Sequence, residues 1–403
     1  PAPTPTPGPP AHNDHQPYSA DTYACAACHR VHSATAPKAL EKRWPEEEVC
    51  FTCHDGTGAA PNIKAQFQKT FTMPVTDPAK TGIHSLVEPR TKDPSLFSGA
   101  NRHVECTDCH NPHYASQGTH PRGSSYAYGP LQGMWGISAT YTDPWTPPAF
   151  APVSRVTYEY ELCFKCHSSW AYGGTPPPSP SGGFQQTDQS KEFNPLNASY
   201  MPVVAQGKNP FVYETGPNVG QSYAQSLLNG DGGTSNRLMP TSRITCTDCH
   251  GSDIQGDPKG PHGSNNPFIL RRPWDRTTGQ SPSNGGANTS NHLCFLCHDY
   301  TMYTNPNNEQ SYNQTGFSGG QPNLHARHLG KGQNKVTGQP IVCMDCHIAV
   351  PHGWQRDHLL GFNSDGAPYI NRPGGGGLQT IDTWAPSGGW DRDNCATAMN
   401  TCR

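Results

Sequence analysis

Cys106-Thr-Asp-Cys109-His110 is one of seven copies of the pattern Cys-x-x-Cys-His in this chain. In each copy two thiols lie three residues apart and a histidine follows directly. Numbered as sites 1 to 7 in chain order, the copies are Cys25-Ala-Ala-Cys28-His29, Cys50-Phe-Thr-Cys53-His54, Cys106-Thr-Asp-Cys109-His110, Cys163-Phe-Lys-Cys166-His167, Cys246-Thr-Asp-Cys249-His250, Cys294-Phe-Leu-Cys297-His298 and Cys343-Met-Asp-Cys346-His347. The pattern is typical of c-type haem attachment, in which both thiols form thioethers to the porphyrin and the histidine becomes the proximal iron ligand. The sequence therefore predicts seven covalently attached haems.

Two other uses of paired cysteines explain the pattern less well. Zinc ribbons also contain Cys-x-x-Cys pairs, but a tetrahedral zinc site gives no reason for a histidine after every second cysteine. A disulfide between cysteines three residues apart would close a strained and easily reduced loop. It would also leave the histidine unexplained, so haem attachment is the interpretation that uses all three positions of the motif.

The composition limits how such a chain can fold. Only 33% of the 403 residues are hydrophobic, and the chain contains 42 Gly and 42 Pro, well above ordinary usage. Because such a chain cannot bury a conventional core, we expect the haem macrocycles to supply the apolar interior. The expected fold is a multihaem cytochrome fold organised around a chain of haems, mostly coil with little regular secondary structure and short helices at the haem sites, such as Tyr158 to His167. Without haem the chain should be largely disordered.

The sites alternate between two kinds of local sequence. Sites 1, 3, 5 and 7 are followed by a further histidine, whereas sites 2, 4 and 6 carry a phenylalanine directly after the first cysteine. Internal repetition of this kind indicates a repeated structural unit, which we interpret as a haem pair. The predicted organisation is a Pro-rich N-terminal segment over 1–20 and a single heptahaem domain over 21–403, with haem pairs at 21–60, 100–170 and 240–300, a terminal haem at 320–360 and a tail at 361–403.

Histidine is abundant enough to ligate each iron twice, since the chain contains 20 His and only seven Met. Bis-His ligation closes both axial positions of the iron and gives a lower potential than Met/His ligation. The first candidates for distal ligands are the histidines that follow the odd sites: His32, His113, His262 and His352. Further candidates precede sites 3 and 7: His84, His103 and His328, with His325 as a near-equal alternative to His328.

The remaining histidines have weaker claims to an iron. His292 suits a polar surface role as well as ligation, and His12 and His15 lie in the Pro-rich start, where a solvated tail is the simplest interpretation. We expect His120 and His358 to stay unligated.

Cysteine use and hydropathy indicate the compartment. No stretch approaches the roughly 18 apolar residues that a membrane-spanning helix needs. Covalent haem is attached outside the cytoplasm, so we expect an extracellular or cell-surface protein whose signal peptide was removed before Pro1. Of 16 Cys, two lie outside the motifs, and Cys395 and Cys402 are expected to form a local disulfide, with free thiols or an intermolecular bridge as alternatives. The formal net charge of −3 gives no sign of a nucleic acid or anionic membrane partner.

The pairing of Cys106-Thr-Asp-Cys109-His110-Asn-Pro-His113 with Leu162-Cys163-Phe-Lys-Cys166-His167 resembles the doubled-CxxCH multihaem cytochromes. The Gly and Pro content and the number of sites are similar to those of the extracellular cytochrome filaments, or nanowires, of metal-reducing microbes. In that family haems stack in alternating parallel and T-shaped pairs, and a histidine near the N-terminus of one subunit can ligate a haem of the next. The resemblance implies identical subunits joined head to tail, with His12, His15 or His32 in that role, and extracellular acceptors such as metal oxides or other cytochromes.

These observations favour an electron-transfer protein over an enzyme. The leading hypothesis is long-range extracellular electron transfer through closely stacked bis-His haems, in a subunit that polymerises. One alternative is a soluble periplasmic or surface electron carrier. Another is a multihaem oxidoreductase, whose open haem often departs from the attachment pattern, whereas all seven motifs here end in His. A surface or adhesion protein with incidental haems is the third.

A pyridine haemochrome assay on the purified protein should give seven haems per chain, one for each motif. Each pair of thiols must then be consumed in thioether bonds, so the motif cysteines should not react with thiol reagents after denaturation. Far fewer than seven haems per chain would contradict haem attachment and favour zinc or disulfide sites.

Overall fold

The computed structural model describes residues 23–34, 40–43, 45–58, 61–76, 104–118, 121–176, 186–208, 211–212, 219–274, 290–310, 315–318, 323–332, 340–361 and 365–369. Over these ranges the chain is mostly coil with short helices and small two-stranded sheets, which confirms the fold class expected from the composition. The longest helix in these ranges, α8 (Leu324–Lys331), has eight residues. No helix of the described residues is long and apolar enough to cross a membrane.

Helices are short throughout and most of them carry or flank a Cys-x-x-Cys-His site. The α-helices are α1 (Tyr23–Cys28), α2 (Glu46–Cys50), α3 (Cys106–Cys109), α4 (Glu159–Cys163), α5 (Ser169–Tyr172), α6 (Gln189–Glu192), α7 (Tyr300–Thr304) and α8. The tighter 3-10 turns, labelled η, are η1 (Lys64–Gln68), η5 (Gly129–Leu131), η6 (Ala224–Ser226), η7 (Cys246–Asp248), η8 (Pro267–Ile269), η10 (Leu293–Leu296), η11 (Pro306–Asn308), η12 (Cys343–Asp345) and η13 (Asp357–Leu359).

Every one of the seven motifs closes into a helical turn. In each, the histidine N–H donates to the carbonyl of the first cysteine, at distances from 2.8 Å in site 1 to 3.0 Å in sites 2 and 7. Residues three and four positions apart on a helix share one face, so both thiols and the imidazole point to the same side of the turn. The local sequence thus prepares each motif to hold one flat ligand.

Acidic residues fix where several of these turns begin. In sites 3, 5 and 7 the aspartate before the second cysteine accepts the backbone N–H three residues upstream, at 2.8 Å for Asp108 and 2.9 Å for Asp248 and Asp345. In site 4, Glu161 accepts the N–H groups of Thr157 and Tyr158, at 2.6 and 3.0 Å. Caps of this kind stabilise a helix start, and α4 has five residues within the predicted helix of 158–167.

Three antiparallel sheets join segments of the chain. They pair β1 (Phe71–Thr72) with β5 (Gly263–Ser264), β2 (Gly136–Thr140) with β3 (Ala149–Val153), and β4 (Ser199–Tyr200) with β6 (Gly353–Trp354). Only β2 and β3 are neighbours in sequence and form a hairpin. The other two sheets connect segments more than a hundred residues apart, and they set the course of the coil between the sites.

The two smallest sheets are copies of one arrangement. β1 leads into Met73-Pro-Val75 and β4 into Met201-Pro-Val203. The N–H of Met73 donates to the carbonyl of His262 at 3.1 Å, and that of Met201 donates to the carbonyl of His352 at 2.7 Å. Each sheet therefore places a histidine that follows an odd site against a segment that follows an even site.

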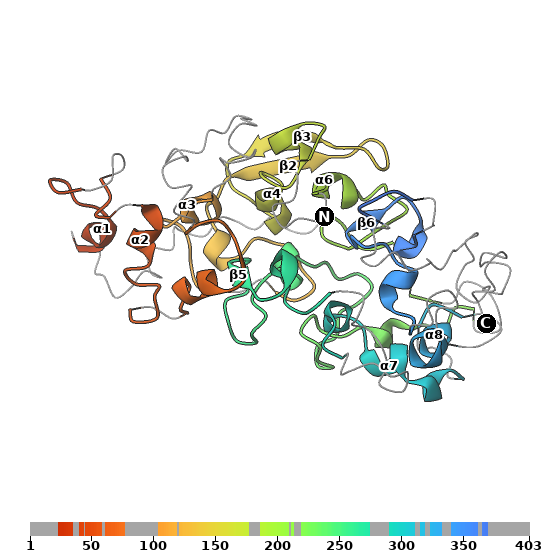
Figure 1. Ribbon diagram of the computed structural model, residues 1–403. Coiled ribbons are helices and arrows are strands. Elements are labelled where there is room, and N and C mark those ends of the chain that lie inside the picture. The colour runs from red at the N-terminus through yellow and green to blue at the C-terminus, as the bar shows by residue number, and fades with distance from the viewer. Residues whose placement is uncertain are drawn as a thin grey trace.

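The molecule is elongated, as Figure 1 shows. The helices α1, α2, α3 and α4 follow one another from one end toward the middle, and α7 and α8 lie at the opposite end. Buried apolar side chains form separate clusters along this axis, one around Ile137, Phe164 and Phe193 and smaller ones near sites 5 to 7. The aliphatic side chains of the described residues thus pack locally around the sites.

Glycine is required where β6 meets the end of α6. A Cβ atom added to Gly353 would lie 1.8 Å from the carbonyl oxygen of Glu192, a backbone atom that cannot move aside. We expect Gly353→Ala to lower the free energy of unfolding of the haem-loaded protein by about 1–3 kcal/mol, as overpacking does elsewhere. Urea unfolding followed by circular dichroism measures this change. Gly174→Ala is the matched control, because its added Cβ meets nothing within 4 Å; equal stability of the two variants would contradict the prediction.

Candidate haem sites

Each even site lies against the odd site that follows it. Thiols in hydrogen-bond contact join sites 2 and 3, sites 4 and 5, and sites 6 and 7: Cys50 with Cys106, Cys163 with Cys246, and Cys294 with Cys343. In each pair the contact is made by the first cysteine of both motifs. Each contact joins two consecutive sites across a boundary between the units expected from the sequence, which were haem pairs at 21–60, 100–170 and 240–300 and a terminal haem at 320–360.

A glutamate clamps two of these junctions. Glu46, four residues before the first cysteine of site 2, accepts both the N–H and the hydroxyl of Thr107 in site 3, at 2.9 and 2.6 Å. Glu159 makes the same two bonds to Thr247, both at 2.9 Å, across sites 4 and 5. Burial raises the pKa of Glu46 to about 7, although the hydrogen bonds from Thr107 act to lower it. Two-point hydrogen bonding to a buried carboxyl group fixes both the distance and the orientation of the paired turns.

At the third junction, between sites 6 and 7, both the glutamate and the threonine of the clamp are replaced by other residues. Site 6 has Ser290 where sites 2 and 4 have glutamate, and site 7 has Met344 where sites 3 and 5 have threonine. His292, fully buried, accepts the N–H of Cys294 at 3.2 Å and caps the turn. The junction keeps its thiol contact while an apolar side chain takes the place of the hydroxyl.

Other contacts complete the order of sites. Burial and the neighbouring Cys50 raise the pKa of the Cys28 thiol, which places site 1 beside site 2. The ammonium group of Lys165 donates to the carbonyl of Asp108 at 2.8 Å between sites 4 and 3. Burial and the neighbouring Cys249 raise the pKa of the Cys297 thiol between sites 5 and 6. Sites 1 to 7 are therefore adjacent in chain order along the molecule.

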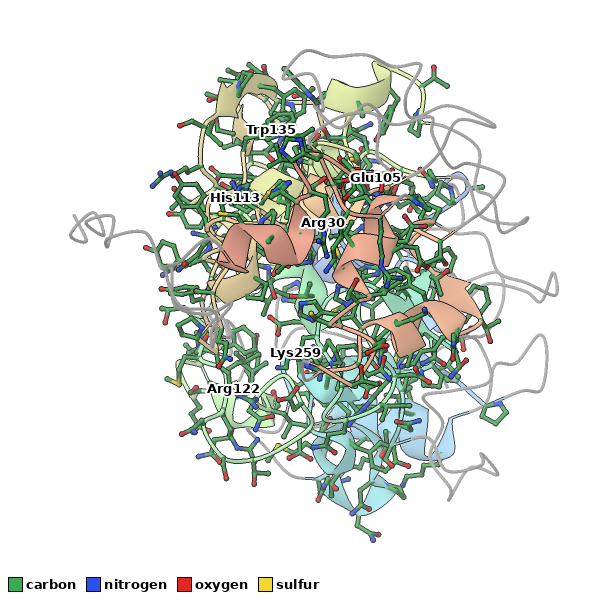
Figure 2. All side chains as sticks on the ribbon, turned by 90° about the vertical axis from the view of Figure 1, so that its left-hand side faces the viewer. Arg30, Glu105, His113, Arg122, Trp135 and Lys259 are labelled. Carbon is green, nitrogen blue, oxygen red and sulfur yellow. The ribbon has the colours of Figure 1, made fainter. Side chains whose placement is uncertain are left out.

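Asp231 gathers three cations beside sites 5 and 6. It binds Arg271 at 2.5 Å, Lys259 at 3.5 Å and also Arg122, and Figure 2 shows Arg122 and Lys259 on the same part of the molecule. Partial burial acts to raise the pKa of Asp231, but these hydrogen bonds and charges hold it at about 2. Three cations around one carboxylate leave a positive charge that suits anionic groups such as haem propionates.

Four pairs of histidine rings lie at nearly the same separation. The ring centroids are 6.3 Å apart for His29 and His113, 6.1 Å for His110 and His262, 6.2 Å for His250 and His352, and 6.4 Å for His325 and His347. A metal–imidazole bond is about 2 Å long, so two such bonds and the half-widths of two rings separate the centroids by about 6 Å. The donor set and its spacing fit an iron ligated by both rings.

The pairs follow a rule along the chain. The histidine after site 3 faces the proximal histidine of site 1, the one after site 5 faces site 3, and the one after site 7 faces site 5. Each of these pairs spans two odd sites and ties together segments distant in sequence. At site 7 the partner, His325, comes instead from α8, directly upstream of the motif.

Hydrogen bonds at Nδ1 leave the other ring nitrogen as the ligand atom. The Nδ1 atoms of His110, His250 and His347 lie 3.0, 2.8 and 2.8 Å from the carbonyls of Pro130, Phe268 and His358. Because a carbonyl only accepts hydrogen bonds, Nδ1 must carry the proton and Nε2 is the basic nitrogen. A bond of this kind also fixes the ring plane of a metal ligand.

The site histidines are held in the neutral form. Burial, together with nearby histidines, lowers the pKa of His250 to about 4 and that of His262 to about 3. Burial likewise lowers the pKa of His298 to about 4 and lowers that of His110 and His325. Neutral imidazole is the form that ligates iron, so these residues need not lose a proton to bind at neutral pH.

Other predicted ligands are placed as follows. His328 lies one turn after His325 on α8, and its Nδ1 donates to the carbonyl of Leu324 at 2.7 Å, which leaves Nε2 as a ligand atom. His32 is exposed, close to α1. The residues that lie outside the described part of the chain are His84, His103, His12, His15, His120, Cys395, Cys402 and the whole segment 1–20.

Sequence reasoning missed the clamps and underrated one histidine. The sequence contains a pattern that could have predicted the clamps. Sites 2 and 4 have a glutamate four residues before the first cysteine, and sites 3 and 5 have a threonine directly after it. His325 was placed behind His328, yet His325 is the ring that faces His347. The two lie three residues apart on one helix, and their order in sequence carries no information about which of them faces His347.

Replacing a facing histidine should open one axial position. We expect His113→Ala to add one high-spin ferric haem per chain to the electron paramagnetic resonance spectrum, because His29 would keep a ligand on one side only. His292→Asn is the control, since an amide oxygen can still accept the N–H of Cys294. An unchanged low-spin spectrum in His113→Ala would exclude His113 as a ligand.

Comparison with known proteins gives one match. A family model for the doubled CXXCH motif matches residues 15–59 and 239–303, which contain sites 1, 2, 5 and 6. No curated protein and no solved structure matches the chain. The family match, together with the repeated motif and the spacing of its histidines, supports a multihaem c-type cytochrome with covalently bound haem.

Proposed function

We propose that this protein is an electron conduit that carries seven covalently attached haems, one at each motif. When bound, c-type haem supplies a one-electron couple between ferric and ferrous iron. The observation that carries the proposal is the unbroken adjacency of sites 1 to 7, from thiol contacts at three junctions to Lys165 and Asp108 at another. A path with a gap at any junction would not serve long-range transfer.

The histidines support electron transfer over substrate chemistry. We propose His113, His262, His352 and His325 as distal ligands of sites 1, 3, 5 and 7, opposite the proximal histidine of each. His84, His103 and His328 remain the candidates for the even sites. An iron with two imidazole ligands offers no open position to a substrate and changes little in geometry on reduction. An enzyme of the multihaem oxidoreductase type would need one site without such a pair.

We further propose that identical subunits join head to tail into an extracellular filament that delivers electrons to metal oxides or other cytochromes. His32 supports this, because it follows site 1 as His113 follows site 3 and is exposed close to α1. Val31 and Leu40 beside it are 73% and 50% exposed, and Figure 2 looks onto this end, with Arg30 and His113 labelled. His32 of one copy would ligate an even site of the next in place of one of His84, His103 and His328, with His12 and His15 as alternatives. An interface that does not close on itself builds an open filament.

The soluble carrier remains the second candidate function. It has the same chain of haems but needs neither the exposed apolar residues nor a histidine in reserve at the α1 end. The soluble carrier and the filament subunit differ in oligomeric form, and electron microscopy distinguishes single particles from filaments.

Cryo-electron microscopy of the native protein released from cells should show filaments in which one haem chain runs through successive subunits. We expect His32→Ala to give dispersed particles, whereas Ser33→Ala, an exposed neighbour without a ligand atom, should still polymerise. Filaments of His32→Ala with an unaltered spectrum would remove His32 from the interface and leave His12 and His15 to be tested. Dispersed wild-type particles would favour the soluble carrier.

A further inference from the structure

Two histidines occupy matching places in the repeated arrangement but meet different side chains. His262 lies beside β1 and η1, and His352 lies beside β4 and α6. The glycine after each histidine packs against one backbone carbonyl, that of Gln66 for the first and that of Glu192 for the second, where an added Cβ would lie 1.9 and 1.8 Å away. Gln66 and Glu192 therefore hold the same position relative to the two rings.

The phenylalanines next in sequence support this equivalence. The ring of Phe67 lies 5.8 Å from that of His262, and the ring of Phe193 lies 4.8 Å from that of His352. The repeated geometry thus includes a phenylalanine against each distal imidazole. What changes between the copies is the residue before it.

Glu192 is fully buried and bonds directly to the imidazole. Its Oε2 lies 2.7 Å from Nδ1 of His352, and its Oε1 accepts the hydroxyl of Tyr369 at 2.7 Å. Burial and the adjacent Glu192 raise the pKa of Tyr369, so its hydroxyl stays a donor. Both oxygens of the carboxylate are thereby satisfied, one of them by the ring that faces His250.

Gln66 offers no charge at the equivalent place. Its Nε2 donates to Asp257 at 2.9 Å, and its Oε1 is buried with no hydrogen-bond partner in the described part of the chain. Nδ1 of His262 is buried and, over the same residues, likewise without a partner. The imidazole that faces His110 is therefore not bonded to an anion there.

We propose that Glu192 sets a lower reduction potential at site 5 than the neutral Gln66 allows at site 3. This rests on the proposed function, in which His352 and His262 are the distal ligands of those sites. A carboxylate that holds the proton of Nδ1 makes Nε2 a stronger donor. The negative charge of the carboxylate also stabilises the oxidised haem, which carries one more positive charge than the reduced haem. Burial strengthens this electrostatic stabilisation.

The proposal gives chemically identical sites different roles along the conduit. Sites 3 and 5 share the attachment sequence Cys-Thr-Asp-Cys-His and the same helical turn. With Glu192 at one and Gln66 at the other, an electron resides longer at site 3 than at site 5. The chain thus sets the order of potentials with a residue outside every motif.

The test is a redox titration of the haem-loaded Glu192→Gln variant, followed by optical absorption and by electron paramagnetic resonance. Glutamine keeps the size of the side chain and can still accept the Nδ1 proton, so only the charge is lost. We expect one component to show a reduced-to-oxidised ratio about tenfold higher at a fixed potential, which is a shift of 59 mV for one electron. Gln66→Glu should shift a different component in the opposite direction.

Asp188→Asn is the matched control. Asp188 caps the same short helix, α6, by accepting the N–H groups of Ser190 and Lys191 at 3.0 and 3.3 Å, and asparagine is an equally good cap. It removes a buried negative charge that has no bond to the histidine. A shift in Glu192→Gln well beyond that in Asp188→Asn therefore reports the charge of the carboxylate that is bonded to His352, whereas equal shifts would overturn the proposal.

The outcomes separate this inference from the proposed function. If the wild-type protein lacks low-spin haem at site 5, so that His352→Ala leaves the spectrum unchanged, the ligand assignment itself fails. If Glu192→Gln retains every low-spin haem and titrates as wild type, only the role of Glu192 is refuted. Should Glu192→Gln not fold, Tyr369→Phe serves in its place: without the tyrosine hydroxyl the carboxylate charge concentrates on His352, and the same component should move to lower potential. A titration identical to wild type would then reject the proposal.

Discussion

The facing of two imidazole rings at a separation of about 6 Å is the constraint on which the rest of this structure depends. At sites 1, 3 and 5 the two rings come from segments far apart in sequence, so each pair fixes the distance between two separate stretches of the chain. The small sheets support this task, since β5 and β6 each begin directly after a histidine of such a pair. A chain with 33% hydrophobic residues can be held in one shape by a series of such ties where a continuous apolar core is lacking.

Adjacency of the sites follows from a second, more local set of interactions. Each motif is one helical turn, and the turns meet at their first cysteines in pairs of an even and an odd site. Glu46 and Glu159 lock two of these meetings with paired hydrogen bonds to a threonine. Because the carboxyl group bonds both the backbone and the side chain of its partner, neither turn can rotate without losing a buried hydrogen bond. The order of sites along the axis is the product of these junctions.

Repetition makes the differences between copies informative. The copies around His262 and His352 share a glycine, a phenylalanine and a Met-Pro-Val segment, and they differ where Gln66 replaces Glu192. The junctions between sites also differ in single residues. The glutamate and threonine that join sites 2 and 3 are replaced by Ser290 and Met344 at sites 6 and 7. The two copies thus retain the glycine that packs against a backbone carbonyl and the phenylalanine beside the imidazole, while the charge of the side chain near the histidine differs.

The sequence by itself determined the attachment motifs and the sparse secondary structure, and it predicted histidine as the second ligand. These depend on residues within a few positions of one another or on composition. Only the tertiary structure decided which histidine faces which site, because the two members of most pairs are separated by long stretches of coil and all histidines are chemically alike. His325 and His328 lie on one helix, and only the direction in which each side chain leaves α8 brings His325, and not His328, against His347. Likewise Glu192 is an ordinary acidic residue in sequence, and it meets Nδ1 of His352 only because β4 and β6 pair across more than 150 residues.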